Sequence, residues 1–151
     1  MQVDSDRTYH FVCAPTVVWD VLVRTDEYRS WWPWLRRFER GPLEPGARWS
    51  CVVQPPLPYR VAFDLVIDEV HDGSLVTATV AGGLHGAARL ELEPDGSGSV
   101  LHLAASLTPT DRLLRAVAVA APPVARFGHD WILDTGFRQF ASALGDRGTD
   151  T

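Results

Sequence analysis

The sequence contains no lysine and no asparagine, so all fourteen of its cationic side chains are arginines. The missing lysine excludes Schiff-base chemistry, the lysine of a phosphate-binding P-loop and a lysine acting as a catalytic base. Isoleucine is also scarce, occurring only as Ile67 and Ile132. Since these three amino acids use AT-rich codons, their rarity indicates a GC-rich bacterial genome as the source.

Cysteine and clustered histidine are also scarce. Cys13 and Cys51 are too few for a disulfide scaffold or a zinc cage. The five histidines lack the short spacings typical of metal ligands, so we expect no metal and no cofactor. There is no Gly-x-Ser-x-Gly elbow. The glycines around His85 join two strand-like segments, and no helix follows them, which excludes a phosphate-binding loop.

Long apolar runs and excess positive charge are missing as well. The longest uncharged apolar run, residues 116–125, contains Pro122 and Pro123 and is too short for stable membrane insertion. A formal net charge of −5 argues against nucleic-acid binding. The early charges Asp4, Asp6 and Arg7 are not typical of a secretory signal, which favours a cytoplasmic location.

What is present is the composition of an ordinary globular domain. The chain has 151 residues, 46% of them hydrophobic and 22% charged. This length predicts a single domain over residues 1–151 that buries a core without metal or disulfide support. We expect an ordered core over about residues 5–144, a helix end at Gly145 and a tail over residues 145–151.

Hydrophobic periodicity predicts the elements. Alternation of period two and regularly spaced turns predict an antiparallel sheet. The expected strands cover residues 5–13, 36–43, 47–54, 59–70, 74–82, 86–93 and 99–107. Helical spacing predicts two short helices between the first two strands, over residues 15–23 and 25–32. A short helix over 111–121 and a long one over 123–144 complete the chain.

This order predicts an α+β fold in which a curved seven-stranded antiparallel sheet wraps around the long C-terminal helix. One amphipathic helix cannot cover such a twisted sheet completely. We therefore expect a cavity between the helix and the sheet, and we regard it as the functional feature of the sequence.

Several motifs occur in a collinear order along the chain. They are FVCAPTVVWDVL at residues 11–22, YRSWWPWLRRFE at 28–39, LPYRVAFDLVIDEV at 57–70, VAGGLHGAARLELEPDGSGSVL at 80–101 and VARFGHDWILDTGFRQF at 124–140. Together they resemble the SRPBCC superfamily of START-related helix-grip domains, in particular its bacterial polyketide cyclase/dehydrase-like branch. The branch commonly has asparagine where Gly128 stands here.

The resemblance implies a helix-grip fold and an apolar ligand, and covers about residues 9–144. It carries over no catalytic residue, since the superfamily has no shared catalytic triad and a fold is a weak guide to chemistry. It also leaves open whether the chain is an enzyme.

His129 is the candidate for acid–base chemistry because it lies on the inward stripe of the long helix, near its start. The positive helix end disfavours imidazolium, which would keep His129 neutral and able to accept a proton. Asp130 points about 100° away around the helix and is a poor partner for it. The other interpretation is a buried histidine bonded to a backbone carbonyl.

The candidate ligand-binding residues combine an aromatic group, one strand and the inward stripe of the long helix. Trp31, Trp32 and Trp34 either pack a helix turn onto the sheet or gate the cavity. Arg89 is expected on the solvent face, and would clamp a ligand carboxylate only if the sheet curled the other way. The full set is Tyr28, Trp31, Trp32, Trp34, Tyr59, Val61, Phe63, Leu65, His85, Leu133 and Phe137.

Three functional hypotheses follow. The first is binding of a hydrophobic small molecule in the cavity, with cyclase or dehydratase chemistry in which His129 moves a proton and Tyr59 or a water polarises a carbonyl. The second is a non-catalytic carrier or chaperone of a hydrophobic metabolite. The third is a partner-binding module using the Trp31–Trp34 surface, which expects a filled core and an exposed aromatic patch. The oligomeric state is open, with a dimer as one option.

Overall fold

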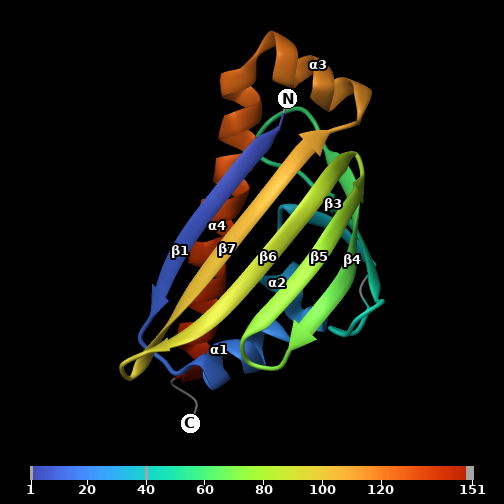
Figure 1. Ribbon diagram of the computed structural model, residues 1–151. Coiled ribbons are helices and arrows are strands. Elements are labelled where there is room, and N and C mark those ends of the chain that lie inside the picture. The colour runs from blue at the N-terminus through green and yellow to red at the C-terminus, as the bar shows by residue number, and fades with distance from the viewer. Residues whose placement is uncertain (1, 40, 149–151) are drawn as a thin grey trace.

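The computed structural model describes residues 2–39 and 41–148. Seven strands form one antiparallel sheet in the order β1-β7-β6-β5-β4-β3-β2, and the long helix α4 lies along one face of it (Figure 1). The strands are β1 (Val3–Phe11), β2 (Leu35–Glu39), β3 (Arg48–Val53), β4 (Val61–His71), β5 (Leu75–Gly82), β6 (Leu84–Asp95) and β7 (Gly98–Pro109). The helices are α1 (Pro15–Leu22), the 3-10 turn η1 (Thr25–Glu27), α2 (Tyr28–Trp31), α3 (Arg112–Ala120) and α4 (Pro122–Gly148).

Local sequence signals explain where the helices begin. Pro15 and Pro122 occupy the first positions of α1 and α4, where a missing N–H costs no hydrogen bond. The side chain of Asp111 caps α3 by accepting a hydrogen bond from the backbone N–H of Leu114 at 3.1 Å. The expected curved sheet, its long C-terminal helix and the short helices after the first strand are all confirmed.

Three expected boundaries are wrong. The second strand ends at Glu39 rather than near residue 43, and Tyr59 lies in the loop before β4 rather than in the strand. Helix α4 passes through Gly145 and continues to Gly148, because Gly145 does not adopt the positive φ that ends a helix. A glycine inside a helix costs only about 1 kcal/mol relative to alanine. The rest of the expected tail, residues 149–151, lies outside the described residues.

The short helices and the C-terminal half of α4 close one end of the sheet. Val18 and Val21 of α1 are almost fully buried, together with Leu92 of β6. Phe140 of α4 packs edge-on against Phe11 of β1, with ring centroids 5.8 Å apart. This end is therefore a filled core. No helix within residues 2–39 and 41–148 is long and apolar enough to span a membrane.

Candidate functional site

The opposite end of the grip is hollow. A cavity of about 260 Å³ lies between the N-terminal half of α4, the inner side of α3 and the sheet. For comparison, a dry engineered cavity of about 150 Å³ is large enough to hold benzene. The space therefore accepts a guest larger than one aromatic ring. Its lining residues are Val3, Trp34, Val53, Pro55, Tyr59, Val61, Phe63, Leu84, Leu107, Pro109, Leu114, Ala118, Ala125, Gly128, His129, Ile132 and Leu133.

No charged side chain other than a titratable histidine lines this main cavity. Burying an unpaired charge among such side chains would be costly, so the lining favours a neutral guest. Its polar groups include the Tyr59 hydroxyl and the His129 ring. A guest with one or two oxygen atoms would match them.

Two smaller compartments continue the hollow along the sheet. The second, of about 190 Å³, shares Trp34, Ile132 and Leu133 with the main cavity. The third, of about 160 Å³, shares Leu22, Leu90 and Leu103 with the second. The interior is thus a row of three apolar spaces separated by side chains rather than by backbone.

Trp34 forms the partition between these spaces. Its indole stacks on that of Trp32, with ring centroids 5.4 Å apart, and its Nε1–H donates a hydrogen bond to Gln139 Oε1 at 2.8 Å. It also borders an outer groove of about 610 Å³ that runs over residues 54–58. Gly136 makes room for the ring, because a Cβ there would lie 3.1 Å from Trp34 Cζ2.

The structure places the predicted ligand-binding residues in different compartments. The main cavity contacts Trp34, Tyr59, Val61, Phe63 and Leu133. The second compartment contacts Trp32 and Phe137 and shares Leu133, while Tyr28 and Leu65 border the third. Trp31 borders none of the three and packs edge-on against Trp32 and Phe140. His85 is exposed and lies outside the lining, because its neighbour Leu84 takes the inward position on β6.

His129 faces the main cavity from α4. Its Nε2 is buried and has no hydrogen-bond partner among the described residues. Burial lowers the pKa of His129, Arg126 and Arg7 lower it further, and Asp130 opposes them. The predicted direction agrees, but the predicted cause is wrong: His129 is two turns from the start of α4, beyond the reach of the helix-end field.

Tyr59 reaches the cavity from its loop by packing against Gly128 of α4. A Cβ at position 128 would overlap the Tyr59 hydroxyl, and it would lie 3.3 Å from Leu57 and from Pro55. Gly128 therefore creates the space that the Tyr59 hydroxyl occupies. Burial raises the pKa of Tyr59, so its hydroxyl is a hydrogen-bond donor at neutral pH.

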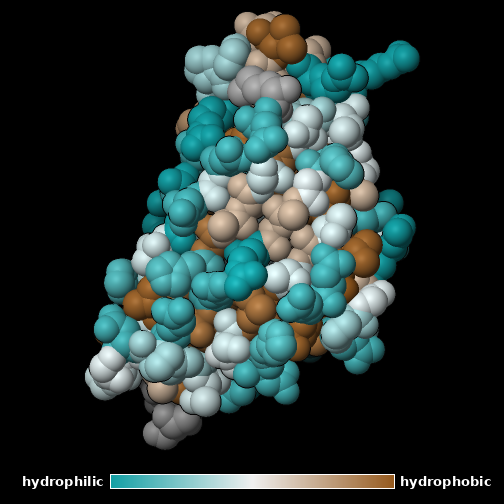
Figure 2. Space-filling view, in the orientation of Figure 1, coloured by the Kyte–Doolittle hydropathy of each residue, from teal (hydrophilic) through white to brown (hydrophobic). Residues whose placement is uncertain are grey.

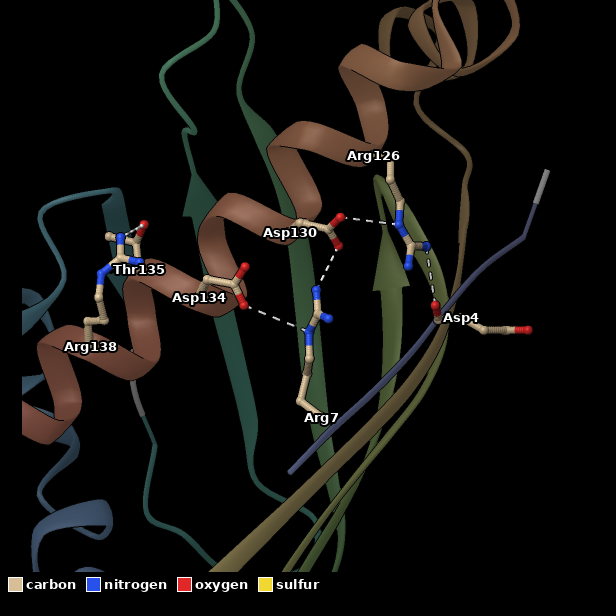
Figure 3. Close-up of polar contacts among 7 residues, drawn as sticks. All are labelled: Asp4, Arg7, Arg126, Asp130, Asp134, Thr135 and Arg138. Atoms are coloured by element: carbon tan, nitrogen blue, oxygen red, sulfur yellow. Dashed lines mark hydrogen bonds and ion pairs between the residues drawn. The ribbon is translucent and has the colours of Figure 1, made fainter. Parts of the chain in front are cut away.

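Charged side chains fasten α4 to the edge strand β1. Arg7 donates to Asp130 at 2.9 Å and lies 3.9 Å from Asp134, while Arg126 contacts the other oxygen of Asp130 at 3.3 Å (Figure 3). Asp130 is fully engaged on this outer side, as its angular offset from His129 predicts. Arg126 also donates to the backbone carbonyl of Asp4 at 3.3 Å.

The described part of the chain has four buried side-chain polar atoms without a hydrogen-bond partner, and all lie between β1 and α4. They are Ser5 Oγ, Arg7 Nε, Tyr9 Oη and His129 Nε2. The three β1 residues alternate along the strand and point to the same side. Buried polar atoms of this kind bind water or a polar ligand group.

The surface expectations have mixed outcomes. Arg89 is exposed and pairs with Glu91, so it does not act as an inward clamp. Arg60 and Asp64 do not pair with each other: Arg60 contacts Gln54, and Asp64 contacts Arg48 at 3.3 Å. Burial, followed by the nearby Asp64 carboxylate, raises the pKa of Cys51 to about 12, which leaves that thiol unreactive.

Sequence analysis missed part of the main cavity. Leu114 and Ala118 of α3 face it at a four-residue spacing, and Val3 enters from the start of β1. The spacing in α3 was a usable signal of an inward stripe. No local pattern shows that this stripe turns over the open end of the sheet.

Residues 2–145 match the model of a family described as polyketide cyclase / dehydrase and lipid transport. None of the curated proteins matches the chain. An uncharacterised protein of Thermus thermophilus is structurally similar, with a TM-score of 0.78, 11% identity and coverage of 97% of this chain and 99% of that one.

Two enzymes are also structurally similar. The Zhui aromatase/cyclase of a Streptomyces species has a TM-score of 0.70, 13% identity and coverage of 97% of this chain and 93% of that one. Norcoclaurine synthase of Thalictrum flavum, solved with dopamine and hydroxybenzaldehyde, has a TM-score of 0.68, 10% identity and coverage of 97% and 88%. At these identities the similarity shows a shared fold.

Proposed function

Because the chain belongs to the polyketide cyclase / dehydrase and lipid transport family, and so to the SRPBCC superfamily, we propose that its main cavity binds a neutral apolar molecule. The observation that carries the proposal is the unpartnered Nε2 of His129 inside an otherwise apolar lining. A bound carbonyl or hydroxyl group would satisfy this nitrogen and remove the cost of leaving it buried and unpaired.

The binding test compares two alanines on α3. Ala118 is buried and lines the cavity, whereas Ala116 is exposed on the same helix. We expect Ala118→Leu to weaken binding of β-tetralone, a neutral bicyclic ketone, by at least about tenfold, because the larger side chain fills the space. Ala116→Leu should leave the affinity unchanged. Titration calorimetry measures both, and equal affinities would remove the cavity from the binding site.

The same site supports proton transfer. With its pKa lowered, His129 is neutral at pH 7 and can accept a proton from the carbon next to a ligand carbonyl. The Tyr59 hydroxyl can donate a hydrogen bond to that carbonyl oxygen and stabilise the charge that develops on it. Such a step is part of cyclisation and dehydration of polycarbonyl chains, in a cavity that excludes water.

Deuterium exchange distinguishes catalysis from carriage. In deuterated water, the wild-type protein should accelerate exchange of the acidic protons of β-tetralone, followed by NMR. His129→Gln should abolish the acceleration and keep measurable binding, since glutamine can form a hydrogen bond but cannot accept the proton. Tight binding by the wild type without accelerated exchange would instead favour a non-catalytic carrier.

A partner-binding role for the Trp31–Trp34 surface is not supported. That hypothesis expected a filled core and an exposed aromatic patch. The cavity contradicts the first expectation. Trp31, Trp32 and Trp34 are all partly buried, and the Trp32 indole N–H donates to the Gly136 carbonyl at 3.0 Å, which contradicts the second.

A further inference from the structure

The corner between α3 and α4 exposes large apolar side chains at one end of the molecule. Val119 is 80% exposed, Leu113 56% and Phe127 51%, and Val124 lies beside them. This corner projects beyond the end of the sheet in Figure 1, and Figure 2 shows an apolar cap at the same place with hydrophilic side chains around it. Exposed apolar side chains gathered in this way are typical of an interaction surface.

The apolar character of this corner is not needed for the core. Leu114 and Ala118 already bury the inner face of α3 against the main cavity. The uncharged run over residues 116–125 nevertheless continues around the helix and through the turn into α4. The outer face could have been polar without loss of packing, so a separate role accounts for it better.

Arginines border this apolar tip. Arg112 and Arg115 are exposed on α3, and neither forms an ion pair with any residue that the structure describes. The neighbouring acid, Asp111, is occupied in capping the helix. In a chain with a net charge of −5, a cationic and apolar tip differs from the rest of the protein.

We propose that the α3–α4 corner docks reversibly onto a bilayer that contains anionic phospholipids. Val119, Leu113 and Phe127 would enter the boundary between headgroups and acyl chains, and Arg112 and Arg115 would contact lipid phosphates. An apolar face bordered by arginine is the pattern of helices that lie in a membrane interface. Docking of this kind differs from spanning, for which the uncharged run is too short.

Charge favours a lipid surface over a second copy of the chain. A symmetric dimer through this corner would bring the same patch of both copies together. Arg112 and Arg115 would then face the arginines of the partner, with no free carboxylate on α3 to pair with them. An anionic bilayer provides the missing opposite charge.

Docking would also place the roof of the cavity next to the bilayer, since the inner face of α3 lines that cavity. An apolar guest could then pass between lipid and cavity without crossing water. This consequence depends on the proposed ligand binding, whereas docking itself does not, and the two are tested separately.

The test is flotation with vesicles of phosphatidylcholine, with or without phosphatidylglycerol, and no added ligand. We expect binding to the anionic vesicles only, weakened about tenfold by Val119→Glu through lost apolar contact and charge repulsion. The matched control is Val12→Glu, since Val12 is 97% exposed at the opposite end of the sheet. It should bind like the wild type.

A second variant tests the charge contribution separately. Replacing Arg112 and Arg115 each by glutamine should weaken binding about fivefold per residue and reduce its dependence on salt. Absent vesicle binding, or an equal loss in Val12→Glu, would overturn the proposal. So would a dimer, seen by sedimentation, that Val119→Glu dissociates while vesicle binding is unchanged. Circular dichroism verifies that each variant is folded.

Discussion

The two halves of α4 pack against the same sheet with opposite results. The C-terminal half presents Phe137 and Phe140, which meet Tyr9 and Phe11 and leave a filled core. The N-terminal half presents Ala125, Gly128 and His129 to the same sheet and leaves a cavity of about 260 Å³. The difference lies in side-chain volume, because the backbone grip is common to both halves.

This comparison teaches that the cavity is encoded by small residues on one short stretch of helix. A sheet that curves around a helix keeps its distance unless large side chains bridge the gap. Aromatic residues bridge it at one end. At the other end, Gly128 also makes room for the Tyr59 hydroxyl, which gives the empty half a polar group.

The largest expected effect is at the filled end. Phe140 is 4% exposed and contacts both Phe11 and Trp31, so Phe140→Ala should reduce the free energy of unfolding by about 3–5 kcal/mol. Leu133→Ala, at the cavity wall, should cost about 2 kcal/mol, since one side of Leu133 has few neighbours to lose. Urea denaturation measures both, and equal losses would contradict the difference between the halves.

An intermediate effect is expected where α4 meets Tyr59. Gly128→Ala should reduce the free energy of unfolding by about 1–3 kcal/mol, because the new methyl group displaces the Tyr59 hydroxyl. The control is Gly145→Ala, where a Cβ meets nothing within 4 Å and the gain in helix propensity is up to about 1 kcal/mol.

Tyr59→Phe should recover part of the loss in Gly128→Ala, because it removes the overlapping oxygen. A double-mutant cycle by thermal or urea unfolding measures this coupling. Strictly additive effects of the two substitutions would show that Gly128 does not position Tyr59.

The smallest expected effect is the pH dependence due to His129. Its pKa is lower in the folded state than its ordinary value of 6.5, so the unfolded chain binds more protons between these two values. Stability should therefore be fully present above pH 6.5 and decrease as the pH falls through the folded pKa. Each unit of lowering corresponds to about 1.4 kcal/mol.

Urea denaturation across that pH window measures the slope. His129→Gln should flatten it, because the titrating group is gone. His85→Gln, at an exposed histidine outside the cavity, should retain the slope because His129 is still present. A slope that survives His129→Gln would assign the pH dependence to other groups.

Much of the fold could be predicted because its signals are local. Alternation along residues 61–67 follows from one face meeting the core, and Pro15 marks a helix start by its own geometry. Helix ends were less predictable, since Gly145 ends a helix only in a left-handed conformation that the sequence does not specify. The single-domain interpretation of residues 1–151 stays a prediction.

The candidate site was predicted in part. The inward position of His129 and Leu133 follows from helical spacing, and both line the main cavity. His85 was misplaced because a glycine-rich segment conceals which of two neighbouring residues faces inward. Their roles toward a ligand stay predictions.

The sequence by itself determined the order of strands and helices and the small residues on one half of α4, since both depend on residue type and periodicity. Only the tertiary structure decided that α3 closes the hollow end, that Trp34 divides the interior and that Tyr59 occupies the space beside Gly128. These are contacts between residues far apart in the chain, and packing across such distances leaves no pattern in a local stretch of sequence.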